Sequence, residues 1–123
     1  MTDSRNRAGR GRADDRQVNR SRSDQAPAAS GAAVRARLRL IVAGQVQGVF
    51  YRAAAADQGR ALALGGWARN LADGTVEIVA EGRRVGLAQF AAWARLGPPH
   101  ARVDGVIEEW GEFADEFREF TVR

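Results

Sequence analysis

The sequence predicts an α+β domain in which an antiparallel sheet carries two helices on one face. Three observations predict it: strand-like alternation of apolar and polar residues starts at Val34, two segments with helical spacing follow, and strand-like segments flank each of them. Before Val34, residues 1–33 contain one valine and no other large apolar side chain after Met1. We therefore place the folded domain at residues 34–123.

The N-terminal segment, residues 1–33, combines seven Arg with four Asp, which accounts for +3 of the chain's net charge of +4. A segment so poor in apolar side chains cannot bury enough surface to offset chain ordering, so we expect a disordered, arginine-rich tail. An arginine-rich arm that contacts RNA or an anionic surface is one open alternative. A second alternative is that translation starts downstream of Met1.

The first strand and the first helix are predicted from two different spacings of apolar residues. Residues 34–42 alternate apolar side chains with mostly arginine, which indicates a strand with one polar face. Residues 50–64 indicate a helix, with Gly59 inside it at a cost of about 1 kcal/mol. The expected buried face of this helix consists of Phe50, Ala53, Ala54, Ala61 and Leu64.

A hairpin is predicted next. Residues 66–70 form a short strand, and residues 75–80 form its partner with Val76, Ile78 and Ala80 on one side. Between them lies Asp73-Gly74, a dipeptide typical of tight hairpin turns.

The second helix is predicted at residues 84–96, where Gly97 and the two prolines after it stop the helical pattern. Strands follow at residues 103–110 and 117–123. The resulting order is β-α-β-β-α-β with a short extra C-terminal strand. This order predicts a ferredoxin-like βαββαβ sandwich.

Composition narrows the class of protein. The absence of cysteine excludes a disulfide framework and a thiolate zinc site. Residues 34–123 hold twelve Arg and eleven acidic residues, a net charge of +1, so we do not expect a broad nucleic-acid surface. We find no apolar run of membrane-spanning length and no apolar core of a secretory signal. We therefore expect a cytoplasmic monomer without membrane contact.

The turn at residues 44–52 (GQVQGVFYR) joins the first strand to the first helix. Such a turn presents several backbone N–H groups to one point, where the helix dipole also favours an anion. Arg52 adds a permanent charge whose planar fork matches phosphate. The local chemistry predicts a cradle for phosphate or carboxylate.

The rest of the domain offers few catalytic groups. Residues 34–123 contain no Ser, Cys or Lys, so the common activated nucleophiles are absent from them. His100 is the only histidine and is expected in a surface loop, without a metal. The acidic residues between 108 and 119 are expected on a solvated strand face and loop. An enzyme with this composition would use water as its nucleophile.

Residues 44–52 resemble the signature loop of the acylphosphatase family, small enzymes that hydrolyse carboxyl–phosphate anhydrides. Further matches stand at residues 66–70 (GWARN) with 73–78 (DGTVEI), and at 96–98 (LGP) with 101–103 (ARV). The resemblance covers residues 34–123. It implies the same fold and hydrolysis of a small acyl phosphate, with neither metal nor cofactor.

The resemblance also implies roles for individual residues. The loop amides and Arg52 would hold the phosphate, and Asn70 would orient the attacking water. Without the resemblance, Asn70 reads as a plain turn residue. A merely solvated Arg52 is the alternative for that residue, but a cation opposes the dipole at a helix start, and a bound anion would resolve the mismatch. Gln47 and Tyr51 read as structural supports, and Trp67 as an anchor for the strand that carries Asn70. The expected phosphate loop consists of Gln47, Gly48, Val49, Phe50, Tyr51 and Arg52.

Two other functions remain open from the sequence. A binding module of the same fold would hold phosphate or a related ligand without useful turnover. RNA binding by the sheet would need exposed aromatic side chains on the central strands, and residues 34–42 contain none.

Overall fold

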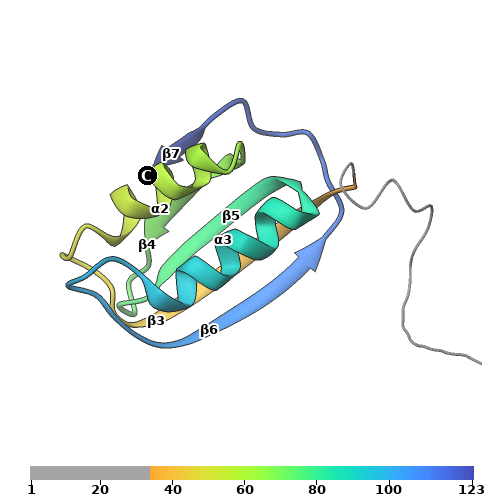
Figure 1. Ribbon diagram of the computed structural model, residues 1–123. Coiled ribbons are helices and arrows are strands. Elements are labelled where there is room, and N and C mark those ends of the chain that lie inside the picture. Colours follow the sequence, from red (N-terminus) through yellow and green to blue (C-terminus); the bar gives the residue numbers. More distant parts are fainter. Residues whose placement is uncertain (1–33) are drawn as a thin grey trace, which may run out of the picture. The chain divides into compact units, whose positions relative to one another are not determined.

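The computed structural model of the protein describes residues 34–123, which contain two helices and five strands (Figure 1). The predicted disorder of residues 1–33 lies outside the described residues. The elements follow one another as β3 (Arg35–Gln45), α2 (Tyr51–Ala61), β4 (Gly65–Asn70), β5 (Val76–Arg83), α3 (Arg84–Leu96), β6 (Arg102–Gly111) and β7 (Phe120–Val122).

The five strands form one sheet in the order β6-β3-β5-β4-β7, and both helices cover the same face of it (Figure 1). The first four strands pair antiparallel, which confirms the ferredoxin-like arrangement. The last strand departs from the prediction. It is shorter than residues 117–123, and it pairs parallel with β4, so the sheet is mixed rather than antiparallel.

The core lies between the sheet and the helices. Every second residue of β3 from Ala36 to Val42 faces the helices and is buried, as the alternating pattern predicts. Phe90 of α3 and Phe120 of β7 are fully buried there, with ring centroids 5.6 Å apart. Removing each such side chain from water contributes roughly 1.5–3 kcal/mol. Among the described helices, none has the length and apolar character needed to cross a bilayer.

The buried face of α2 differs from the predicted one. Phe50 precedes the helix and is 81% exposed, and the helix ends at Ala61 rather than at residue 64. Inside the helix, Gly59 lies so close to Phe120 that a Cβ atom there would collide with the Phe120 ring. Gly59 therefore turns inward and fixes the rotation of the helix. The helical residues that this rotation buries are Tyr51, Ala55, Ala56 and Gly59.

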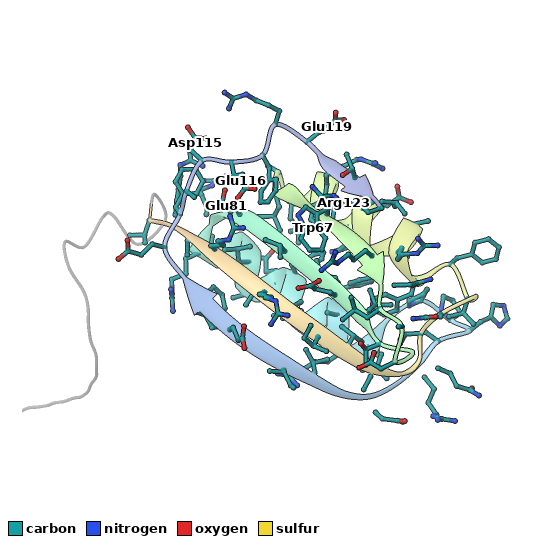
Figure 2. The ribbon with its side chains drawn as sticks, turned by 180° about the vertical axis from the view of Figure 1, so that it is seen from behind. Trp67, Glu81, Asp115, Glu116, Glu119 and Arg123 are labelled. Carbon is teal, nitrogen blue, oxygen red and sulfur yellow. The ribbon has the colours of Figure 1, made fainter. Side chains whose placement is uncertain are left out.

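The face of the sheet away from the helices holds buried carboxylates between arginines, and Figure 2 shows this face. Glu77 of β5 accepts hydrogen bonds of 2.7 Å from Arg39 and from Arg69. Glu81 is held by Arg37 at 3.1 Å and by two backbone N–H groups of the segment after β6. Each carboxylate thus bridges neighbouring parts of the fold.

The buried Glu77 carboxylate makes the stability of the fold depend on pH. Burial alone would raise the pKa of Glu77, but the hydrogen bonds from Arg39 and Arg69 outweigh it and lower the pKa below the usual 4.5. A lowered pKa means that the stabilisation is complete above about pH 4.5 and is lost as the pH falls through the native value. We expect the melting temperature to be level near neutral pH and to fall below pH 4.5. Thermal melts of wild type and Glu77→Gln should show a shallower fall in the variant, and equal slopes would contradict this assignment.

Candidate active site

The loop from β3 to α2 is shaped by two residues with positive φ. Gly48 has φ 75°, and a Cβ atom there would meet nothing within 4 Å, so the space above it is open. Phe50 has φ 64° and ψ 22°, a left-handed conformation that is uncommon for a bulky residue. Such strain costs of order 1–3 kcal/mol and persists where the surrounding structure imposes it. The loop is therefore held in one shape at the start of the helix.

The first turn of α2 presents free backbone donors. The first helical hydrogen bond runs from the N–H of Ala54 to the carbonyl of Phe50 at 3.0 Å. Within residues 34–123, the N–H groups of Tyr51, Arg52 and Ala53 donate to no protein acceptor, and no side chain caps the helix. No acidic residue lies in this turn. Free N–H groups and the helix dipole favour an anion at this position.

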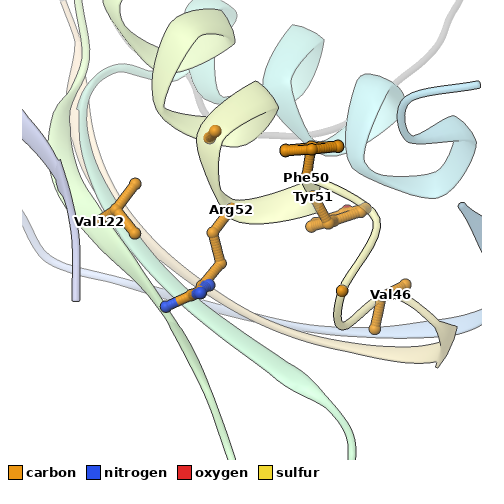
Figure 3. A pocket seen from close by; sticks show the side chains of 7 residues that line it. Val46, Phe50, Tyr51, Arg52 and Val122 are labelled. Atoms are coloured by element: carbon orange, nitrogen blue, oxygen red, sulfur yellow. The ribbon is translucent and has the colours of Figure 1, made fainter. Parts of the chain in front are cut away.

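Arg52 extends from this turn toward the sheet, between Val122 and Val46 (Figure 3). Its Nη1 donates a hydrogen bond of 2.6 Å to the backbone oxygen of Arg123. Among the residues that the structure describes, Arg52 is the only charged one that lines a cavity of about 270 Å³. A guanidinium has five N–H donors, so the remaining donors stay available to a ligand. The cavity lining consists of Val46, Gly48, Phe50, Tyr51, Arg52, Ala53 and Val122.

Two side chains fasten the loop to the rest of the fold. The hydroxyl of Tyr51 is buried and donates a hydrogen bond of 2.7 Å to the carbonyl of Ala94 in α3, and burial raises the pKa of Tyr51. The Nε2 of Gln47 donates to the carbonyls of Leu71 and Thr75, both at 2.9 Å. Tyr51 thus ties the loop to α3, and Gln47 ties it to the turn between β4 and β5.

Asn70 lies exposed at the end of β4 and does not line the cavity. The turn after it is closed by Leu71 N–H donating to the Thr75 carbonyl at 2.8 Å and by the Asp73 carboxylate. Within residues 34–123, the Asn70 side chain makes no hydrogen bond, so the turn does not use it. Gln47 holds the loop against Leu71 and Thr75, which places the loop beside the strand end that carries Asn70.

Four of the six predicted loop residues line the cavity, namely Gly48, Phe50, Tyr51 and Arg52. Gln47 and Val49 do not, and Val49 packs partly buried against the core. The sequence analysis missed Val46, Ala53 and Val122 as lining residues. Val46 and Ala53 flank the predicted segment directly. Val122 carries no local signal, because the parallel pairing of β7 with β4 brings it to the cavity.

Other candidate groups lie outside the cavity. His100 is exposed in the loop between α3 and β6. Among residues 34–123, no three His, Asp or Glu side chains are grouped as a metal site. Four of the acidic residues between 108 and 119 pair with arginines. The pairs are Glu108 with Arg95, Glu109 with Arg39, Asp115 with Arg118, and Glu116 with Arg37.

Comparison with known proteins shows the family of this chain. A family model described as acylphosphatase matches residues 38–122. An acylphosphatase of Anaeromyxobacter dehalogenans is 48% identical over 89 residues, which span 72% of this chain and 96% of the relative. An acylphosphatase of Methylococcus capsulatus is 50% identical over 86 residues, 70% of this chain and 94% of the relative. The solved structure of an acylphosphatase from Coxiella burnetii aligns with a TM-score of 0.70 and 35% identity, covering 74% of this chain and 95% of that one.

Proposed function

The chain belongs to the acylphosphatase family and hydrolyses acyl phosphates, and on this premise we propose how its own residues perform the reaction. The phosphoryl group of the substrate occupies the cavity at the start of α2. The free N–H groups of Tyr51, Arg52 and Ala53 and the Arg52 guanidinium hold its oxygens. The observation that carries this proposal is that the free N–H groups of the helix start coincide with Arg52, the one charged residue among the described residues that line the cavity.

Charge stabilisation is the main contribution of this cradle. An acyl phosphate is a reactive anhydride, so positioning and stabilisation of developing charge supply most of the catalysis. The arginine fork and the amides are fixed before the substrate arrives, because Gln47 and Tyr51 hold the loop. Fixed donors need little reorganisation in the transition state.

Water is the nucleophile in this proposal, and Asn70 orients it. A carboxamide accepts a hydrogen bond from water through its oxygen and donates one to a phosphoryl oxygen through its nitrogen. The Asn70 amide has both functions free, since the turn beside it is closed by other groups. The water oxygen bonds to phosphorus while the bond from phosphorus to the acyl oxygen breaks, which releases a carboxylate. The proton of the water passes to a phosphate oxygen of the substrate.

The acyl part of the substrate lies along the apolar side of the cavity, formed by Val46, Phe50 and Val122. Phe50 offers the largest apolar surface there, with 81% of it exposed. An aromatic acyl group would cover part of this surface and gain from its removal from water.

Within the part of the chain that the structure describes, the proposed site is built from residues between 46 and 123. We propose that a single chain without metal or cofactor is sufficient for turnover, that the protein works as a cytoplasmic monomer, and that it makes no functional contact with nucleic acid.

The test is hydrolysis of benzoyl phosphate by the full chain with a chelator present. We expect turnover that the chelator does not change and that varies little from pH 6 to pH 8, because the described lining of the cavity contains no His, Asp, Glu, Cys or Lys to act as a general base. A steep change of the rate with pH in this range would contradict a mechanism without a titrating general base. Tight binding of phosphate without turnover would indicate a binding module.

A further inference from the structure

The guanidinium of Arg52 is held by a neighbour that is far away in the sequence. Its Nη1 donates to the backbone oxygen of Arg123 at 2.6 Å. Arg123 in turn donates its backbone N–H to the carbonyl of Ala68 in β4 at 2.8 Å. The position of the Arg52 fork therefore depends on how firmly Arg123 is fixed beside β4.

Backbone pairing alone gives Arg123 little support. It follows β7, an edge strand of three residues with one neighbouring strand. Strand ends with few partners are where order is lost first. A second contact is needed to hold the backbone oxygen of Arg123 in one place.

That second contact is made by Trp67. The Arg123 guanidinium carbon lies 4.5 Å from the centre of the Trp67 ring, and Figure 2 shows both side chains on the sheet face away from the helices. Trp67 is only 9% exposed although it belongs to that outer face and not to the core between sheet and helices. The ring is therefore covered, and a covered aromatic face attracts a guanidinium more strongly than an exposed one.

Other side chains on the outer face of the sheet fix the Trp67 ring. Arg69 lies 5.1 Å from the same ring and is held by Glu77 at 2.7 Å. Glu77, which lies in β5, also accepts a hydrogen bond from Arg39 in the neighbouring strand β3. Trp67 is thus a rigid support on which Arg123 rests.

We propose that Trp67 is a positioning residue for Arg52, acting through Arg123: the indole ring fixes Arg123, whose backbone oxygen orients the phosphate-binding fork. This inference rests on the proposed phosphate-binding role of Arg52. Trp67 itself touches no substrate. Loss of the support leaves Arg52 in place but broadens the directions in which its fork points, and misdirected donors bind phosphate more weakly.

The first test compares two arginines with matched contacts. Arg84 lies 4.5 Å from the ring of Trp110, the same separation as between Arg123 and Trp67, and it does not line the cavity. Arg123→Ala keeps the backbone oxygen that contacts Arg52 and removes only the guanidinium. We expect Arg123→Ala to lower kcat/KM for benzoyl phosphate, and to raise the inhibition constant of inorganic phosphate, by roughly threefold to tenfold. Arg84→Ala should leave both constants unchanged.

The second test separates the support that the Trp67 ring gives from the effect of the positive charge of Arg123. Trp67→Leu keeps the charge of Arg123 but removes the ring, and we expect a loss similar to that of Arg123→Ala. Trp67→Phe keeps an aromatic face and should restore part of the phosphate affinity. In the Arg123→Ala background, Trp67→Leu should add little further loss, because both changes break the same contact.

Three results would overturn the inference. They are unchanged constants in Arg123→Ala, an unchanged phosphate inhibition constant in a folded Trp67→Leu, and fully additive losses in the double variant. Additive losses would show that Arg123 attracts phosphate by its charge and that Trp67 acts on its own. Absence of hydrolysis in the wild type would instead refute the assigned activity, and Arg52→Lys with normal phosphate affinity would refute the role of Arg52. Each failure is therefore distinguishable from the others.

Discussion

Replacing Arg52 with lysine is expected to lower kcat/KM for benzoyl phosphate by roughly 10²-fold. Lysine keeps the positive charge, so it tests geometry rather than charge. The ammonium group cannot contact the Arg123 oxygen and two phosphate oxygens from one plane, as a guanidinium does. The loss of one or two charge-assisted hydrogen bonds, each worth roughly 1.5–3 kcal/mol, accounts for the size of the effect.

The matched control is Arg95→Lys. Arg95 stands in the last turn of α3, pairs with Glu108 at 2.7 Å and does not line the cavity. It should keep wild-type kinetics. Steady-state rates and competitive inhibition by phosphate measure both variants. Near-normal turnover and phosphate inhibition in Arg52→Lys would remove Arg52 from the proposed cradle.

Replacing Asn70 with alanine is expected to lower kcat by roughly 10²–10³-fold, the usual range for removing one oriented polar group. The inhibition constant of phosphate should change little, because the cradle at α2 remains intact. The melting temperature should also stay close to wild type, since Asn70 is exposed and its side chain makes no hydrogen bond within residues 34–123. A large loss of stability would show that Asn70 is a structural turn residue.

Two further variants sharpen this experiment. Asn70→Asp keeps the size and the acceptor oxygen but loses the donor and adds a negative charge, so it should be at least as impaired as alanine. Asp73→Ala removes the carboxylate that closes the same turn and leaves the Asn70 amide untouched. If Asp73→Ala loses as much activity as Asn70→Ala, the shape of the turn rather than the amide controls the rate.

The sequence predicted most of the fold because the relevant patterns are local. The alternation in β3 and the Asp73-Gly74 turn each arise within a few residues, and the structure confirms both. The rotation of α2 could not be predicted in the same way. Its alanines are compatible with more than one buried face, and the choice depends on the contact between Gly59 and Phe120, which lie on different elements.

The features of the candidate site also divide into those that the sequence predicts and those that only the tertiary structure determines. By itself the sequence determined the family resemblance, the loop that begins α2 and the presence of Arg52, since these depend on consecutive residues. Only the tertiary structure decided that β7 runs parallel to β4 and brings Val122 and Arg123 to that loop. Arg52 and Arg123 are 71 residues apart, and their contact depends on the path of the whole chain between them. No local period encodes such a path, because it is selected by the packing of both helices and all five strands together.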